Sequence, residues 1–213
     1  MRATSSGSRL RPMILSCDSP RWIVAGRLGA ALAAIEEAEY SERMSEASFD
    51  SIRSAFLRDG VKGLKHISDR VSPSDEWIAG LILGIADPDA SVPASWMLRA
   101  YLQQGAELPK QQTVTLLKSL RRIAADDARL HICQLVTHLD IPTRNAEALA
   151  RFLRDCFEGT HKFTRAWAAD GMHRLSLQHE RYRLESLRWI DRASRDEAAS
   201  VRARARQIAR ESS

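Results

Sequence analysis

The chain has 213 residues, of which 44% are hydrophobic and 28% are charged. This balance is typical of a folded globular protein and excludes a collagen-like chain, a fully disordered chain and a disulfide scaffold. The formal net charge of +5 comes entirely from residues 142–213, which hold 15 lysines and arginines against 10 acidic residues. Nucleic acid is therefore a candidate partner, although basic residues interleaved with acids are more typical of a solvated surface.

The amino-acid usage favours helices throughout. The chain has 30 alanines and 23 leucines but only 7 valines. Alanine and leucine lose little side-chain entropy in a helix, whereas β-branched residues suit strands. No segment shows the sustained alternation of apolar and polar residues that is typical of a half-buried strand. We therefore expect an all-α protein.

The first 73 residues are expected to differ from the rest of the chain. Residues 1–20 are mostly basic and polar, and no long apolar segment follows them. We expect a disordered tail there and no secretory signal, although a transit peptide has a similar composition. Residues 21–73 are expected to form an irregular helical cap. One long or two short helices are predicted at about Pro20–Met44, another at Ser45–Arg58 and a short one at Val61–Arg70.

Residues 74–213 contain a repeat with a period near 35 residues. Four segments are predicted as the first helix of a repeat: Asp75–Ala86, Gln111–Ala124, Asn145–Glu158 and Arg181–Ala193. The spacing predicts a second helix after each, at about Ala90–Gln104, Asp126–Leu139, His161–Leu177 and Glu197–Glu211. Because short helix pairs bury their apolar faces only against neighbouring pairs, such a repeat favours a stacked array.

Equivalent positions of the repeats hold similar side chains. In the first helices, apolar pairs three residues apart share one helix face, and we expect them in the core: Ala79 with Ile82, Val114 with Leu117, Leu149 with Phe152, and Leu184 with Leu187. The second helices share a column of mostly small residues, as close packing requires: Trp96, Cys133, Ala168 and Ala205. The residues expected to cap helix N-termini are Ser74 or Asp75, Asp89, Asp126 and Thr143. Gly60, Gly105 and Gly159 are expected to end helices at positive φ.

The second helices also carry a recognisable motif. The sequences Glu197-Ala-Ala-Ser-Val201-Arg202-Ala-Arg-Ala205 and Thr164-Arg165-Ala-Trp-Ala168 resemble the second helix of HEAT-like α-solenoid repeats, which opens with an acidic residue, Val-Arg and spaced alanines. The resemblance covers about residues 74–213. It implies a right-handed α-solenoid of about four helix pairs, with residues 21–73 as its N-terminal cap. Such scaffolds host many functions.

One flank of the predicted helix at 161–177 is a candidate site. Trp167, Asp170 and Arg174 are spaced three and four residues apart, so they follow one side of the helix. The simpler interpretation is a surface ion pair between Asp170 and Arg174 beside a packed tryptophan. The alternative is a groove in which Trp167 stacks on a base or a peptide ring and Asp170 acts as an acid, a base or a hydrogen-bond acceptor.

Three arginines complete the set of candidate binding residues. Arg165 and Arg202 occupy equivalent columns, and we expect them in a ladder near acids such as Asp196 or Glu197. The last helix carries Arg202, Arg206 and Arg210 along one flank. A terminal repeat needs a charged outer face for solubility, but the same arginines are suited to bind nucleic acid or an acidic partner.

No metal site or cofactor is expected. His131 and His138 share a helix face, but Cys133 points about 200° away from His131, so these three donors do not converge. We interpret them as a core cysteine with solvated histidines. The cysteines Cys17, Cys133 and Cys156 form no CxxC pair. Their odd number favours a reducing compartment, so a cytoplasmic location is expected. The longest uncharged apolar run, residues 77–86, is also far shorter than the roughly 20 residues of a membrane span.

No catalytic set of side chains emerges from the spacing. We therefore expect a non-enzymatic protein-interaction module with another protein as its partner. The alternative is a nucleic-acid-binding protein. Its extreme form would be a repair enzyme similar to the alkylpurine DNA glycosylases, a HEAT-like group that uses aromatic residues and an acid in a basic concave face.

Overall fold

Helices make up all the regular secondary structure of the residues that the computed structural model describes, which are 50–71 and 73–211. The described residues belong to one compact unit. Residues 50–59 are helical. The later elements are α2 (Val61–Ser68), α3 (Asp75–Ile85), α4 (Ser91–Gln103), α5 (Lys110–Ser119), η1 (Leu120–Arg122), α6 (Asp126–Leu135), η2 (Val136–His138), α7 (Thr143–Phe157), α8 (Lys162–Gln178), η3 (Glu180–Tyr182), α9 (Arg183–Ser194) and α10 (Ala199–Glu211). The all-α expectation is confirmed for this part of the chain.

The predicted helices match the observed ones closely. The first helices of the four repeats are α3, α5, α7 and α9, and the second helices are α4, α6, α8 and α10. The main difference is that the ends of α5 and α6 tighten into the 3₁₀ turns η1 and η2, a common way to satisfy the last carbonyls of a helix. Of the predicted cap, residues 50–59 and α2 are helical. The expected tail at 1–20 and the cap residues 21–49 lie outside the described residues.

The predicted helix boundaries are confirmed in part. The N-cap predictions for Asp89, Asp126 and Thr143 are wrong, because Ala90, Ala125 and Pro142 occupy those positions before α4, α6 and α7. The Ser74 side chain accepts a hydrogen bond from the Trp77 amide at 3.2 Å and so caps α3. Gly60 and Gly105 have φ angles of 60° and 90°, which glycine adopts without steric cost. The prediction for Gly159 is wrong. Glu158 ends α7 in a right-handed conformation, and the Gly159 amide donates to the Cys156 carbonyl, so no left-handed residue is needed there.

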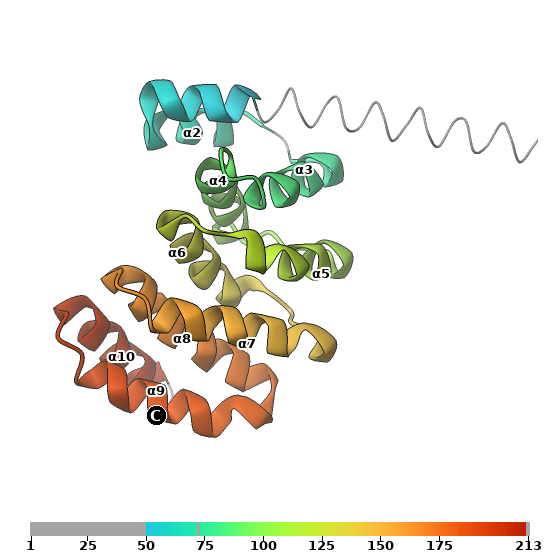
Figure 1. Ribbon diagram of the computed structural model, residues 1–213. Coiled ribbons are helices and arrows are strands. Elements are labelled where there is room, and N and C mark those ends of the chain that lie inside the picture. Colours follow the sequence, from blue (N-terminus) through green and yellow to red (C-terminus); the bar gives the residue numbers. More distant parts are fainter. Residues whose placement is uncertain (1–49, 72, 212–213) are drawn as a thin grey trace, which may run out of the picture. The chain divides into compact units, whose positions relative to one another are not determined.

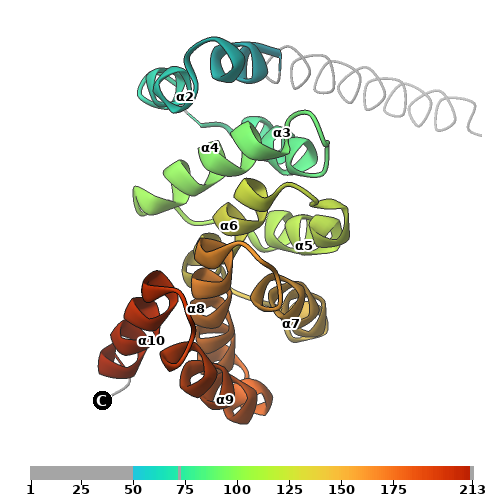
Figure 2. The same ribbon diagram turned by 60° about the vertical axis from the view of Figure 1, so that its left-hand side comes forward.

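The helices pack in two rows. In the first row α3 contacts α5 and α5 contacts α7, and in the second row α4 contacts α6, α6 contacts α8 and α8 contacts α10. Figures 1 and 2 show α3, α5 and α7 following one another on one side of the unit and α4, α6 and α8 on the other. Helix α8 also contacts α7 and α9. It is therefore the helix that joins the last two pairs.

The core is continuous along the two rows, as the repeat predicts. Ile82 and both members of the Val114/Leu117 and Leu149/Phe152 pairs are buried. The small column of the second helices is also buried at Cys133, Ala168 and Ala205. Ala79, however, is exposed.

The core prediction is wrong for the last pair, because Leu184 and Leu187 are 70% and 55% exposed. Helix α9 turns its opposite side toward α7. There the Trp189 ring stacks on Phe157 with the ring centroids 4.3 Å apart, and the Glu185 carboxylate accepts two hydrogen bonds from Arg154, at 2.7 and 2.8 Å. Leu184 and Leu187 lie on the other side of the helix and face outward.

The close packing around α8 depends on a glycine. A Cβ atom added to Gly171 would lie 2.9 Å from Cδ2 of Leu153 in α7 and 3.4 Å from Cγ2 of Val136 in η2. Both of these neighbours are themselves buried. Gly171 thus lets two neighbouring elements approach the backbone of α8 at one point.

A valine at this position is expected to destabilise the fold. Gly171→Val should lower the free energy of unfolding by about 1–3 kcal/mol, because the extra methyl groups overpack a filled core. Urea denaturation followed by circular dichroism measures the change. The exposed Ala203→Val on α10 is the control, with a change within about 0.5 kcal/mol. A Gly171→Val protein as stable as the wild type would contradict the close approach.

Candidate functional site

Three of the six predicted site residues come together between α8 and α10. Asp170 lies 3.6 Å from Nε of Arg174 on the same helix and 3.9 Å from Nη1 of Arg204 on α10. The Arg204 guanidinium stacks over the Trp167 ring, with 3.5 Å between its Cζ atom and the ring centroid. Arg174 also donates a hydrogen bond to Glu211 near the end of α10. These charges tie the last helix to α8.

Asp170 is the most buried of these groups, with only 2% of its surface exposed. Burial raises the pKa of its carboxyl group, and the charges of Arg174 and Arg204 offset part of that effect. The neighbouring His173 has a lowered pKa, because it is desolvated and lies near Arg174. In Glu211 the hydrogen bond from Arg174 lowers the pKa. The arginines thus compensate the Asp170 charge through ion pairs longer than a hydrogen bond.

The other three predicted residues lie outside this cluster. Arg165 donates two hydrogen bonds to Asp196, at 3.1 and 3.2 Å, and also reaches the Glu197 carboxylate. Arg202 donates to the backbone carbonyls of the same two acids, both at 2.7 Å. Both arginines therefore lie beside Asp196 and Glu197, as predicted, but Arg202 binds their backbone carbonyls and not their carboxylates. Arg206 is exposed on α10.

Arg204 is a site residue that the sequence does not single out. The alignment of the second helices with one another nevertheless predicts its contact with Trp167. Thr164 and Ala168 are equivalent to Val201 and Ala205, so Trp167 is equivalent to Arg204. Equivalent side chains of neighbouring repeats lie next to each other, which brings the Arg204 guanidinium onto the Trp167 ring.

The closed geometry limits what the cluster does chemically. One face of Trp167 is covered by Arg204, and an external group reaches Asp170 only if the side chains around it move. The arrangement is thus that of an ion-pair joint between two helices. Ligands or partners have better access to the surface next to it.

That adjoining surface is a cleft of about 550 Å³ between α8, η3 and α9. Its charged and polar lining residues are His173, Arg174, Ser176, Glu180, Arg183, Ser186 and Glu211, and its apolar ones are Leu177, Leu187 and Ile190. Leu177 is 67% exposed. Together with Leu184 and Leu187 it gives three exposed leucines at this end of the described chain. We call Leu177, Leu184, Leu187 and Ile190 the leucine face.

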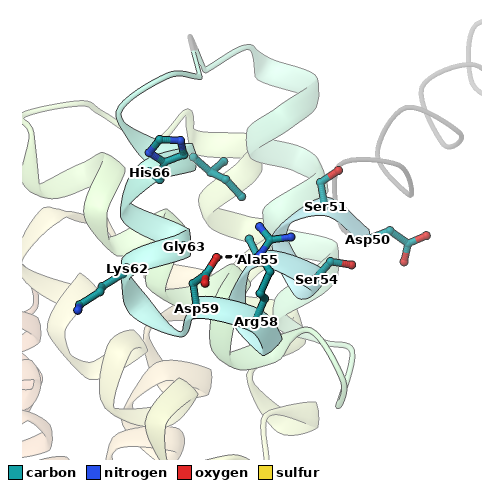
Figure 3. Close-up of a pocket in the computed structure, with 10 residues that line it drawn as sticks. Asp50, Ser51, Ser54, Ala55, Arg58, Asp59, Lys62, Gly63 and His66 are labelled. Carbon is teal, nitrogen blue, oxygen red and sulfur yellow. Dashed lines mark hydrogen bonds and ion pairs between the residues drawn. The ribbon is translucent and has the colours of Figure 1, made fainter.

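A larger cavity, of about 1040 Å³, lies between residues 50–59 and α2. Figure 3 shows polar side chains around it, among them Arg58 and Asp59, which form an ion pair at 2.9 Å. Its titratable side chains, which also include Asp50, Lys62 and His66, are all exposed. It therefore lacks the buried polar groups that orient a ligand in a binding pocket.

Among the described residues, no group of three or more His, Cys, Asp or Glu is arranged to hold a metal ion. Cys133 is a buried core residue and His138 is exposed, as expected. The prediction of a solvated His131 is wrong. Its Nδ1 lies 2.9 Å from the Ser95 hydroxyl oxygen of α4. Burial and nearby Arg99 lower its pKa to about 4.

Comparisons with known proteins leave the site without a precedent. No protein-family model, no curated protein and no solved structure matches the chain. None of the described helices is both long and apolar enough to cross a membrane.

His131 is expected to make the fold sensitive to acid. Its folded-state pKa of about 4 lies below the ordinary value of 6.5, so the unfolded chain takes up this proton first as the pH falls. The stability due to neutral His131 should be lost between about pH 6.5 and pH 4, and amounts to about 3 kcal/mol. Urea unfolding of wild type and His131→Gln across this range measures it.

The variant should lose less stability on acidification than the wild type. His66→Gln, an exposed histidine on α2, is the matched control and should follow the wild-type curve. Parallel curves for His131→Gln and the wild type would contradict a buried neutral imidazole.

Asp170→Asn tests whether burial or the arginines dominate at that carboxyl. Because its pKa is raised, the protonated form is favoured in the folded state. The ionised carboxylate therefore costs stability above that pKa. We expect Asp170→Asn to unfold at higher urea concentration than the wild type at pH 8, and the difference to shrink as the pH falls toward 4. The exposed Asp140→Asn is the control. A destabilised Asn variant at pH 8 would show that the arginine charges outweigh burial.

Proposed function

We propose that the chain is a non-enzymatic protein-interaction module built as a HEAT-like, right-handed α-solenoid of about four helix pairs with an N-terminal helical cap. The two rows of packed helices support the solenoid, since α3, α5 and α7 pack in succession in one row and α4, α6, α8 and α10 in the other. In this proposal the partner docks an amphipathic α-helix on the leucine face of α8 and α9.

The observation that carries the proposal is the exposure of Leu184 and Leu187. Their equivalents Val114/Leu117 and Leu149/Phe152 are buried, in helices that pack against one another along the first row. Helix α9, the first helix of the fourth pair, carries the equivalent apolar pair on an exposed surface. Clustered exposed apolar residues with a polar rim are typical of interaction sites. A helix is the natural occupant because each earlier first helix packs on another helix.

The charges favour a protein partner over nucleic acid. Most arginines of the basic C-terminal third contact groups of the chain itself. Arg154, Arg165 and Arg192 pair with acids of neighbouring elements, Arg202 binds backbone carbonyls and Arg204 stacks on Trp167. Phosphate binding requires cations that are free to replace counterions, so the nucleic-acid alternative has less support.

Two further observations support parts of the proposal. The Asp170 carboxyl, the candidate for acid–base chemistry, is 2% exposed, which favours a structural role over a catalytic one. Cys133 and Cys156 are free thiols, in keeping with a reducing compartment. A cytoplasmic location is therefore part of the proposal.

The test compares protein capture by three forms of the full-length, tagged chain: the wild type, Leu187→Glu and Leu83→Glu. Leu83 is the matched control because it is an exposed leucine, at 58%, on another first helix, α3. We expect a protein that the wild type and Leu83→Glu retain and that Leu187→Glu retains at least about tenfold less. An untagged copy of the chain counts as such a protein. Direct binding is then measured with the purified protein.

Two results would overturn the proposal. One is retention that Leu187→Glu leaves unchanged. The other is the absence of any retained protein together with binding of duplex DNA at physiological salt tighter than about 1 µM, which exceeds ordinary non-specific binding. The second result would establish the nucleic-acid alternative.

A further inference from the structure

The charges around the leucine face have an internal symmetry. Arg183 precedes Leu187 by four residues and Asp191 follows it by four. Each belongs to an exposed ion pair on its own side of the leucines, Arg183 with Glu180 and Asp191 with Arg195. The charge nearer to Leu187 is positive on its N-terminal side, at Arg183, and negative on its C-terminal side, at Asp191. When the helix is turned end to end about Leu187, Arg183 and Asp191 therefore exchange places.

These residues share one side of α9. At 100° per residue, Arg183, Leu184, Ile190 and Asp191 all fall within about 60° of Leu187. All are exposed except Ile190, which is partly buried and lines the cleft. The stretch thus presents a narrow apolar stripe with one charge of each sign at equal distances from its centre. At about 1.5 Å of rise per residue, each charge lies about 6 Å from Leu187 along the helix axis.

A second α9 fits this stripe in the antiparallel direction. With the two helices centred on Leu187, Leu187 meets its own copy and Leu184 meets Ile190 of the other chain. Arg183 then faces Asp191 of the other chain, and two-fold symmetry creates this contact twice. A parallel pair would instead place Arg183 beside Arg183 and Asp191 beside Asp191, which repel.

The energetics fit a modest, reversible association. The ion pairs within each chain, Arg183–Glu180 and Asp191–Arg195, are exposed and contribute little, so exchanging them for contacts between chains costs little. One helix pair with the neighbouring Leu177 covers less surface than the 1,200 Å² or more of standard stable interfaces. We therefore expect a dissociation constant in the range of about 10–100 µM.

We infer that the partner of the leucine face is a second copy of this chain, bound through an antiparallel, two-fold α9–α9 contact centred on Leu187. This inference rests on the proposed function, because it names the occupant of the same face. The self-complementary charges about Leu187 favour a second copy over an unrelated helix.

The experiment measures self-association of the full-length chain by sedimentation equilibrium between about 5 and 500 µM. The wild type should show a monomer–dimer equilibrium, and Leu187→Glu should stay monomeric. Leu83→Glu is the control and should dimerise like the wild type. All the substituted positions are exposed, and urea unfolding confirms that each variant is folded.

A charge exchange tests the antiparallel register. Arg183→Asp alone places acids opposite acids, and Asp191→Arg alone places bases opposite bases, so each should weaken dimerisation at least fivefold. An equimolar mixture of the two variants restores both opposite-charge contacts in a heterodimer. Its dissociation constant should return to within about threefold of the wild-type value.

The outcomes separate the two proposals. A wild-type chain that stays monomeric up to 500 µM overturns the self-association, and so does a mixture of the two charge variants that associates no better than either alone. A monomeric chain that still retains a different protein in a Leu187-dependent way leaves the proposed function standing. If Leu187→Glu changes neither the dissociation constant of the dimer nor the amount of captured protein, the proposed function and the inference are both wrong.

Discussion

A helix of ten to seventeen residues, as α5 and α8 are, has an apolar side that must be covered by something else. Isolated helices of this length are only marginally stable in water, and their stability in proteins comes mainly from packing. Each pair of this chain is therefore incomplete until the next pair covers it. The two continuous rows, the small side chains between second helices and the close approach at Gly171 all follow from this requirement.

The same requirement explains why the last pair differs from the others. Helix α9 uses one side for α7, through Trp189 and Glu185, and contacts α8 and α10 elsewhere. The side with Leu184 and Leu187 is exposed. Helices α7 and α9 thus carry the same apolar pattern in different surroundings. The partner proposed for this face would cover α9 in the way that α5 covers α3.

Much of the helix layout is predictable from the sequence, because the pattern that defines each helix lies within it. The 35-residue register, the Ser74 cap and the glycines at 60 and 105 depend only on local sequence and backbone chemistry.

The environment of single residues is less predictable, because it depends on which neighbour covers them. His131 has the same helical position whether it is solvated or hydrogen-bonded to Ser95 of α4. Leu184 fits a buried column by its register but is exposed, because α9 turns its opposite side toward α7. The contact between Trp167 and Arg204 is intermediate in predictability. It follows from aligning α8 with α10, but neither helix alone indicates it.

The cover that Arg204 provides over Trp167 has a consequence for how the end of the molecule is observed. The indole lies on α8 while the guanidinium above it belongs to α10, so detachment of the last helix alone would open that ring face to water. Indole emission shifts to longer wavelength when the ring becomes hydrated. Trp167 is one of five tryptophans in the chain, so in a variant without the other four its emission reports fraying of α10. Its signal would change before the buried Leu149 and Leu153 of α7 lose their packing, and would distinguish a loose end from an unfolded protein.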